Sequence, residues 1–123
     1  MTEEQIKDLV YEMFSTDSIG AFLDLWLKND LLPEAQQQTL NSYYASYKKY
    51  FGPYIQKNYR EQTRDLVEIP LELSHPKVLE VGAGCGTEVL WLAMKGINVW
   101  GIDIDAKLLS VAQTRKEILE KYT

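Results

Sequence analysis

The chain has 123 residues, 46% of them hydrophobic and 25% charged, which is enough apolar material for the core of one small domain. Its net charge of −5 argues against a nucleic-acid-binding surface, because contacts to phosphates need clustered Lys and Arg. The absence of a signal peptide and of a long apolar run argues against secretion and a membrane location, and the single cysteine excludes an internal disulfide, so we expect a cytoplasmic protein.

Residues 1–75 are predicted to form a helical segment that caps the rest of the chain. Thr2-Glu3-Glu4-Gln5 has a capping-box pattern, and apolar residues recur at helical spacing as far as Phe14. A second helix is expected from Ile19 to Lys28. Pro33 suits the first turn of a third helix, which is expected to continue to Phe51.

Two proline-containing stretches are expected to interrupt this helical segment. Gly52-Pro53 breaks the chain before a fourth helix over about residues 54–65. Ile69-Pro70 to His75-Pro76 is then expected to be an irregular linker, with His75 in a solvated loop.

Four tyrosines, Tyr43, Tyr47, Tyr50 and Tyr54, follow one another at spacings that place them on one face of a helix. One interpretation is a lid whose rings cover a cationic ligand. The other, which we favour, is that they pack the helix against a sheet with their hydroxyls in water.

Residues 76–123 are predicted to form a strand–helix–strand–helix unit. A hydrophobic strand, Val78-Leu79-Glu80-Val81, leads into the glycine-rich stretch Gly82-Ala83-Gly84-Cys85-Gly86. A helix from Thr87 to Lys95 follows, then a second strand over residues 97–102 that ends at Asp103. The last helix is expected from Ala106 to Lys121.

Asp103 has the spacing of a ribose-binding carboxylate. It lies 21 positions after Gly82, close to the roughly 20 residues that separate the glycines from the acidic residue of dinucleotide-binding folds. A carboxylate there would repel a 2′-phosphate, which argues against NADP. The NAD fingerprint requires a third glycine at the position that Thr87 occupies, so NAD is disfavoured as well.

The pattern Glu80-x-Gly82-x-Gly84-x-Gly86, together with Gly101-Ile102-Asp103-Ile104-Asp105, resembles class I S-adenosylmethionine-dependent methyltransferases. The resemblance implies that Gly82, Ala83 and Gly84 pass under the methionine and ribose portions of S-adenosylmethionine and that Glu80 helps to place its ammonium group. It also implies that Asp103 accepts the ribose hydroxyls and that Ile104 packs on the adenine. Asp105 suits the cap of the next helix better than a ligand.

The predicted fold class is α/β: N-terminal helices followed by the first two βα units of a Rossmann-like sheet, incomplete as a monomer. Proteins of the resembled family have seven strands, whereas residues 76–123 hold two. Parallel strands are normally flanked by further strands, so we expect either self-association or a C-terminal half that completes the sheet. No catalytic residue is assigned, and whether this chain alone is an enzyme stays open.

Three functions are therefore weighed. The first is a methyltransferase, or its cofactor-binding N-terminal part, acting on an unidentified acceptor. The second is a non-catalytic module that binds the cofactor or self-associates, and the third is an NAD-binding oxidoreductase fragment. Cys85 is interpreted as a small residue that fills a tight turn, and no metal site is predicted because Cys85 and His75 lack partner ligands.

The last helix is predicted to be amphipathic. Its apolar stripe is expected to consist of Leu108, Leu109, Ala112, Leu119 and Tyr122. Arg115 is placed among the charged residues that solvate the rim.

Overall fold

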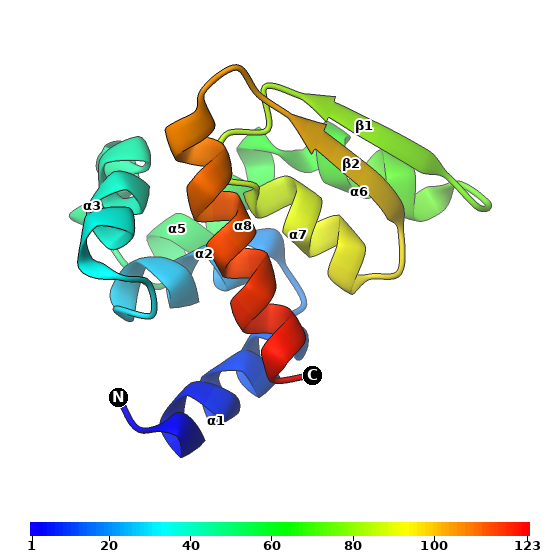
Figure 1. Cartoon of the computed structure of the whole chain (residues 1–123). Helices are drawn as coiled ribbons and strands as arrows, with labels where there is room; N and C mark the ends of the chain where they lie inside the picture. The colour runs from blue at the N-terminus through cyan, green and yellow to red at the C-terminus, as the bar shows by residue number, and fades with distance from the viewer.

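The computed structural model describes residues 1–123 and shows a mixed α/β fold that is mostly helical, with 64% of its residues in helices and a two-stranded parallel sheet (Figure 1). In chain order the elements are α1 (Glu3–Phe14), α2 (Ile19–Lys28), α3 (Glu34–Tyr43), α4 (Ala45–Lys48), α5 (Pro53–Gln62), α6 (Arg64–Glu72), β1 (Lys77–Val81), α7 (Thr87–Met94), β2 (Asn98–Ile102) and α8 (Ala106–Lys121).

The first two helices begin where their capping residues predict. The Thr2 side chain accepts a hydrogen bond from Gln5 N at 3.1 Å, and Gln5 Oε1 accepts one from Thr2 N at 2.9 Å, which completes the predicted capping box. Ser18 caps α2 by accepting from Ala21 N at 3.2 Å. The predicted bounds of α2 are confirmed.

The single helix predicted from Pro33 to Phe51 is wrong. The chain leaves helical geometry at Tyr44, whose φ of −105° and ψ of 33° separate α3 from α4. Tyr44 turns its ring into the core, where it is only 5% exposed, so burial of this ring accompanies the break. The four tyrosines consequently share no continuous helical face: Tyr47 is buried, while Tyr50 and Tyr54 stack on each other at 4.4 Å.

The linker predicted from Ile69 to Pro76 is also wrong over its first half. Helix α6 continues to Glu72 with Pro70 inside it, close to its C-terminus. Pro70 and Val67 are the buried residues of α6, and this helix packs on α7, so burial of an apolar face outweighs the missing hydrogen bond of the proline. His75 lies in an exposed turn, as predicted.

The strand–helix–strand prediction is confirmed. β1 and β2 pair in parallel, in a register that runs from Lys77 opposite Asn98 to Val81 opposite Ile102. Because side chains alternate along a strand, Val78 and Val99 face the core while the opposite face of the sheet remains open. That open face consists of Leu79, Val81, Trp100 and Ile102, each more than half exposed.

One hydrophobic core joins the N-terminal helices to the sheet unit. Its centre lies on α2, where Phe22, Leu23 and Trp26 have no exposed surface. The same cluster includes Leu92 of α7 and Leu119 of α8. Figure 1 shows α8 as the orange to red helix that crosses in front of α2, and α7 as the yellow helix beneath the sheet.

No helix of the chain combines the length and the apolar character that crossing a membrane would need.

Candidate functional site

The glycine loop between β1 and α7 has a backbone conformation that requires its glycines. Gly82, Gly84 and Gly86 have φ values of +76°, +58° and +84°, in the left-handed region that side chains with a Cβ rarely adopt. Gly82 N and Ala83 N both donate to Ile102 O, at 2.8 and 2.9 Å, so the loop is fastened to the carboxyl end of β2. No atom lies within 4 Å of the point where a Gly82 Cβ would stand, so this end of the loop faces open space.

The loop is also closely packed from beneath. A Cβ on Gly86 would come within 2.9 Å of Ala112 Cβ on α8. The Ala83 methyl faces β2, since a Cβ on Gly101 would lie 2.8 Å from it. Ala83 thus packs against the sheet, and Gly82 is the one residue of the loop from Gly82 to Gly86 that is exposed.

The structure brings Asp103 to this loop. Its Oδ2 accepts a hydrogen bond from Gly84 N at 2.8 Å, and its Oδ1 accepts one from Asp105 N at 2.8 Å. The hydrogen bonds from the Asp105 and Gly84 amides lower the pKa of the Asp103 carboxyl, so this group is an anion at neutral pH. Asp105 caps α8 by accepting from the amides of Lys107 and Leu108, as expected.

Glu80 lies on β1, two residues before the loop, and its carboxyl group is partly buried. Burial, and secondarily the charge of Glu88, raise the pKa of the Glu80 carboxyl to about 8. Glu80 Oε1 is buried and has no hydrogen-bond partner. Glu80 and Glu88 both line a cavity of about 280 Å³ that also touches Gly82 and Tyr43.

Tyr43 is the tyrosine that reaches the loop. A Cβ on Gly84 would lie 2.8 Å from Tyr43 Cζ, so the phenol ring lies directly over this glycine. The ring is 47% exposed, and burial together with the charge of Glu88 raises the pKa of its hydroxyl. Of the predicted tyrosine face, only this member lies beside the candidate site.

Ile104 stands apart from the other predicted residues. Its side chain is fully exposed, immediately after Asp103, and it packs on no part of the chain. Cys85 is buried, and burial raises the pKa of its thiol to about 11, which agrees with the prediction of a space-filling residue in the turn.

A buried polar network beneath the loop was missed by the sequence analysis. Arg115, predicted on the solvated rim, is completely buried and donates from Nη1 to Cys85 O at 2.9 Å and to Thr87 Oγ1 at 2.8 Å. The placement of Arg115 in the sequence analysis is therefore wrong. A signal was present, because Arg115 is four residues from both Val111 and Leu119, the other two buried residues of α8.

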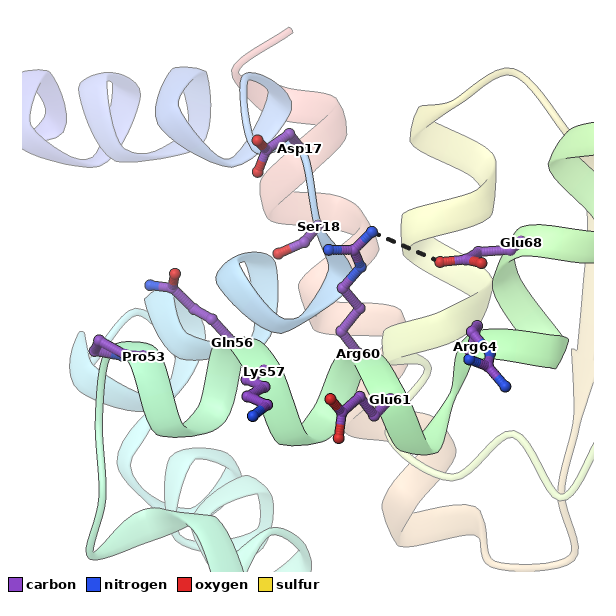
Figure 2. Close-up of a pocket in the computed structure, with 9 residues that line it drawn as sticks. All are labelled: Asp17, Ser18, Pro53, Gln56, Lys57, Arg60, Glu61, Arg64 and Glu68. Carbon is purple, nitrogen blue, oxygen red and sulfur yellow. Dashed lines mark ion pairs between the residues drawn. The ribbon is translucent and has the colours of Figure 1, made fainter.

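The largest cavity of the chain lies elsewhere and contains none of these residues. It measures about 690 Å³ and has no hydrophobic lining; Figure 2 shows its side chains, which come from α5, α6 and the residues before α2. Arg60 and Glu68 pair across it at 3.8 Å. Its entirely polar lining is that of a solvated surface groove, so we place the candidate site at the glycine loop.

No family model, curated protein or solved structure matches this chain. No three His, Cys, Asp or Glu side chains are grouped so as to hold a metal ion.

Proposed function

We propose that this chain binds S-adenosylmethionine at the glycine loop, as the cofactor-binding part of a class I methyltransferase with a Rossmann-like sheet. The observation that carries the proposal is the contact of 2.8 Å between Asp103 Oδ2 and Gly84 N. It lies at the carboxyl ends of two adjacent parallel strands, where open α/β sheets bind their ligands.

The Asp103 carboxylate has acceptor capacity for a ribose. An ionised carboxylate offers about four lone-pair sites, and backbone amides occupy two of them here. Two sites remain, one for each hydroxyl of a ribose. The amides fix the carboxylate in place before a ligand arrives, which lowers the entropic cost of binding.

The cavity beside Glu80 suits the ammonium group of the same cofactor. An ammonium has three donors and no acceptor, and the cavity is lined by Glu80, whose buried Oε1 lacks a partner, and by Glu88. Gly82 lines this cavity with open space beside it, and it lies two residues before Gly84, whose amide holds Asp103. When bound, S-adenosylmethionine supplies a methyl group on a sulfonium, and the Tyr43 ring supplies an aromatic surface for that cation.

Calorimetric titration tests the proposal with S-adenosylmethionine, S-adenosylhomocysteine and NADH as ligands. We expect the two sulfur compounds to bind, and Asp103→Ala to weaken them by roughly 10- to 100-fold, as expected for the loss of charge-assisted hydrogen bonds of about 1.5–3 kcal/mol. Glu117→Ala is the matched control, because Glu117 is an exposed carboxylate on α8 away from the loop. Thermal unfolding of both variants checks that Asp103→Ala preserves the fold.

NADH binding without binding of the sulfur compounds would assign the site to an oxidoreductase cofactor instead. Equal affinities of the Asp103→Ala variant and the wild type would contradict the role given to Asp103.

The second candidate is a self-associating module without catalysis. It is favoured by the open face of the sheet, formed by Leu79, Val81, Trp100 and Ile102, and by the unpaired outer edges of β1 and β2. Parallel sheets are normally covered on both faces, and a two-stranded sheet is marginal alone. A mass that rises with concentration, combined with no response to any of the three ligands, would favour this candidate.

A further inference from the structure

Arg115 is a buried cation without a counter-ion. Its guanidinium lies 4.7 Å from the Trp26 ring centre and 5.9 Å from that of Phe22, and no carboxylate lies within 4 Å of it. Its Nε and Nη2 have no hydrogen-bond partner. Burying an unpaired charge is costly, so this placement requires a compensating interaction beyond packing.

The compensation is a chain of hydroxyl groups that leads from Arg115 to Glu88. Arg115 Nη1 donates to Thr87 Oγ1 at 2.8 Å, and Thr87 Oγ1 lies 2.6 Å from Tyr44 Oη. Tyr44 Oη lies 3.5 Å from Tyr59 Oη, which donates to Glu88 Oε1 at 2.7 Å. This chain of hydroxyl groups therefore joins a cation on α8 to a carboxylate on α7. Two of its members come from other helices: Tyr44 is the N-cap of α4, and Tyr59 lies in α5.

The two ends of this chain impose one direction on it. A guanidinium can only donate, and an ionised carboxylate can only accept. With this direction each hydroxyl accepts from the Arg115 side and donates toward Glu88, and the 3.5 Å contact between Tyr44 and Tyr59 is the longest link. Networks polarised in this way strengthen each of their hydrogen bonds.

Glu88 is the end of this chain of hydroxyl groups, and it reaches the candidate site. It lines the cavity of about 280 Å³ together with Glu80, Gly82 and Tyr43. The Tyr59 hydroxyl holds one oxygen of Glu88, so the orientation of the carboxylate in the cavity depends on the chain behind it.

We propose that Arg115 is a positioning residue for the amino-acid end of the cofactor, acting through Thr87, Tyr44 and Tyr59 to aim the Glu88 carboxylate at the ligand's ammonium group. The proposal rests on the function proposed above. It makes a specific distinction within one ligand: the network serves the ammonium end, whereas Asp103 serves the ribose.

Two nucleosides separate these ends. S-Adenosylhomocysteine carries the amino-acid group, and 5′-methylthioadenosine has the same adenosine and a thioether without it. For Tyr59→Phe, which removes one hydroxyl from the chain, we expect an affinity for adenosylhomocysteine about tenfold lower and an affinity for methylthioadenosine within twofold of the wild type. Tyr47→Phe is the matched control, because Tyr47 is also buried and its hydroxyl donates to Gln62, which does not belong to the chain of hydroxyl groups.

Arg115→Lys and Arg115→Met test the donor at the start of the chain of hydroxyl groups. Lys keeps the charge but lacks the planar fork that reaches Cys85 O and Thr87 Oγ1 together, so we expect the same selective loss from both substitutions. If either variant fails to fold, Tyr59→Phe and Tyr44→Phe still decide the question.

An equal loss for both nucleosides would show that the network serves only the fold, and no loss for either would show that Glu88 needs no aiming; each result overturns the proposal. A wild-type chain that binds neither nucleoside overturns the proposed function as well.

Discussion

The unusual ionisation of Glu80 predicts that the stability of this protein falls as pH rises. The pKa of Glu80 is raised from its usual 4.5 to about 8 in the folded chain, first by burial and then by the charge of Glu88. Between these two values the folded state holds a proton that the unfolded state releases. The stabilisation is therefore complete below about pH 4.5 and is lost as pH rises through 8.

The size of the effect follows from the shift. Each pKa unit corresponds to about 1.4 kcal/mol, so the full shift sets an upper limit of about 5 kcal/mol on the change in the free energy of unfolding with pH. Glu80 is only partly buried, and solvent screens much of this energy. We expect a decrease of roughly 2 kcal/mol between pH 5 and pH 8.

Urea unfolding at several pH values, followed by tryptophan fluorescence, measures this slope. Glu80→Gln should largely abolish it, because the amide cannot ionise, whereas Glu117→Gln on the exposed side of α8 should retain it. A wild-type stability that is constant or rises between pH 5 and pH 8 would refute the argument. So would a Glu80→Gln variant with the wild-type slope.

Ligand binding should release the proton that the Glu80 carboxyl holds at neutral pH. An ammonium group beside Glu80 favours the ionised carboxyl, so binding of S-adenosylmethionine at pH 7 should release close to one proton, about 0.9 for a group with a pKa of about 8. Calorimetry in two buffers of different ionisation enthalpy measures the number released. Proton uptake, or no exchange, would contradict the placement of the ammonium group at Glu80.

Three further outcomes are expected from single substitutions or labels. Gly84→Ala should destabilise the fold by about 1–3 kcal/mol more than Gly82→Ala in urea unfolding, because both have positive φ but only Gly84 would also meet Tyr43; equal losses would contradict that packing. The Cys85 thiol should react with iodoacetamide at pH 7 only on unfolding, since it is buried and has a pKa of about 11; prompt labelling of the folded chain would contradict this. Trp100→Lys should lower the concentration-dependent mass in sedimentation if the open sheet face mediates self-association, and an unchanged mass would exclude that face.

The local order of the sheet unit could be predicted because its signals are local. Glycines, a strand and a terminal aspartate occur within a short stretch, and each acts through its own backbone conformation or cap. The contact between Asp103 and the loop follows from the parallel pairing, since the carboxyl ends of β1 and β2 meet at the same edge.

The elements that were mispredicted depend on long-range packing. Tyr44 breaks a good helical pattern because its ring enters the core and its hydroxyl reaches Thr87, 43 residues later. Arg115 is buried because aromatic rings of α2 receive its guanidinium. A charged residue in an amphipathic helix usually marks the solvated face, and only the tertiary structure shows that this one has a partner network.

The same long-range contacts give the N-terminal helices a direct part in the candidate site. α2 provides the rings around Arg115, and the segment from Tyr43 to Tyr59 provides both the ring above Gly84 and the hydroxyls that lead to Glu88. The glycine loop therefore lies between two groups from this segment, one above it and one beneath it. Because both contacts come from residues 1–75, the geometry of the loop depends on the packing of those helices as much as on its own glycines, and a ligand that orders the loop should stabilise both parts of the chain together.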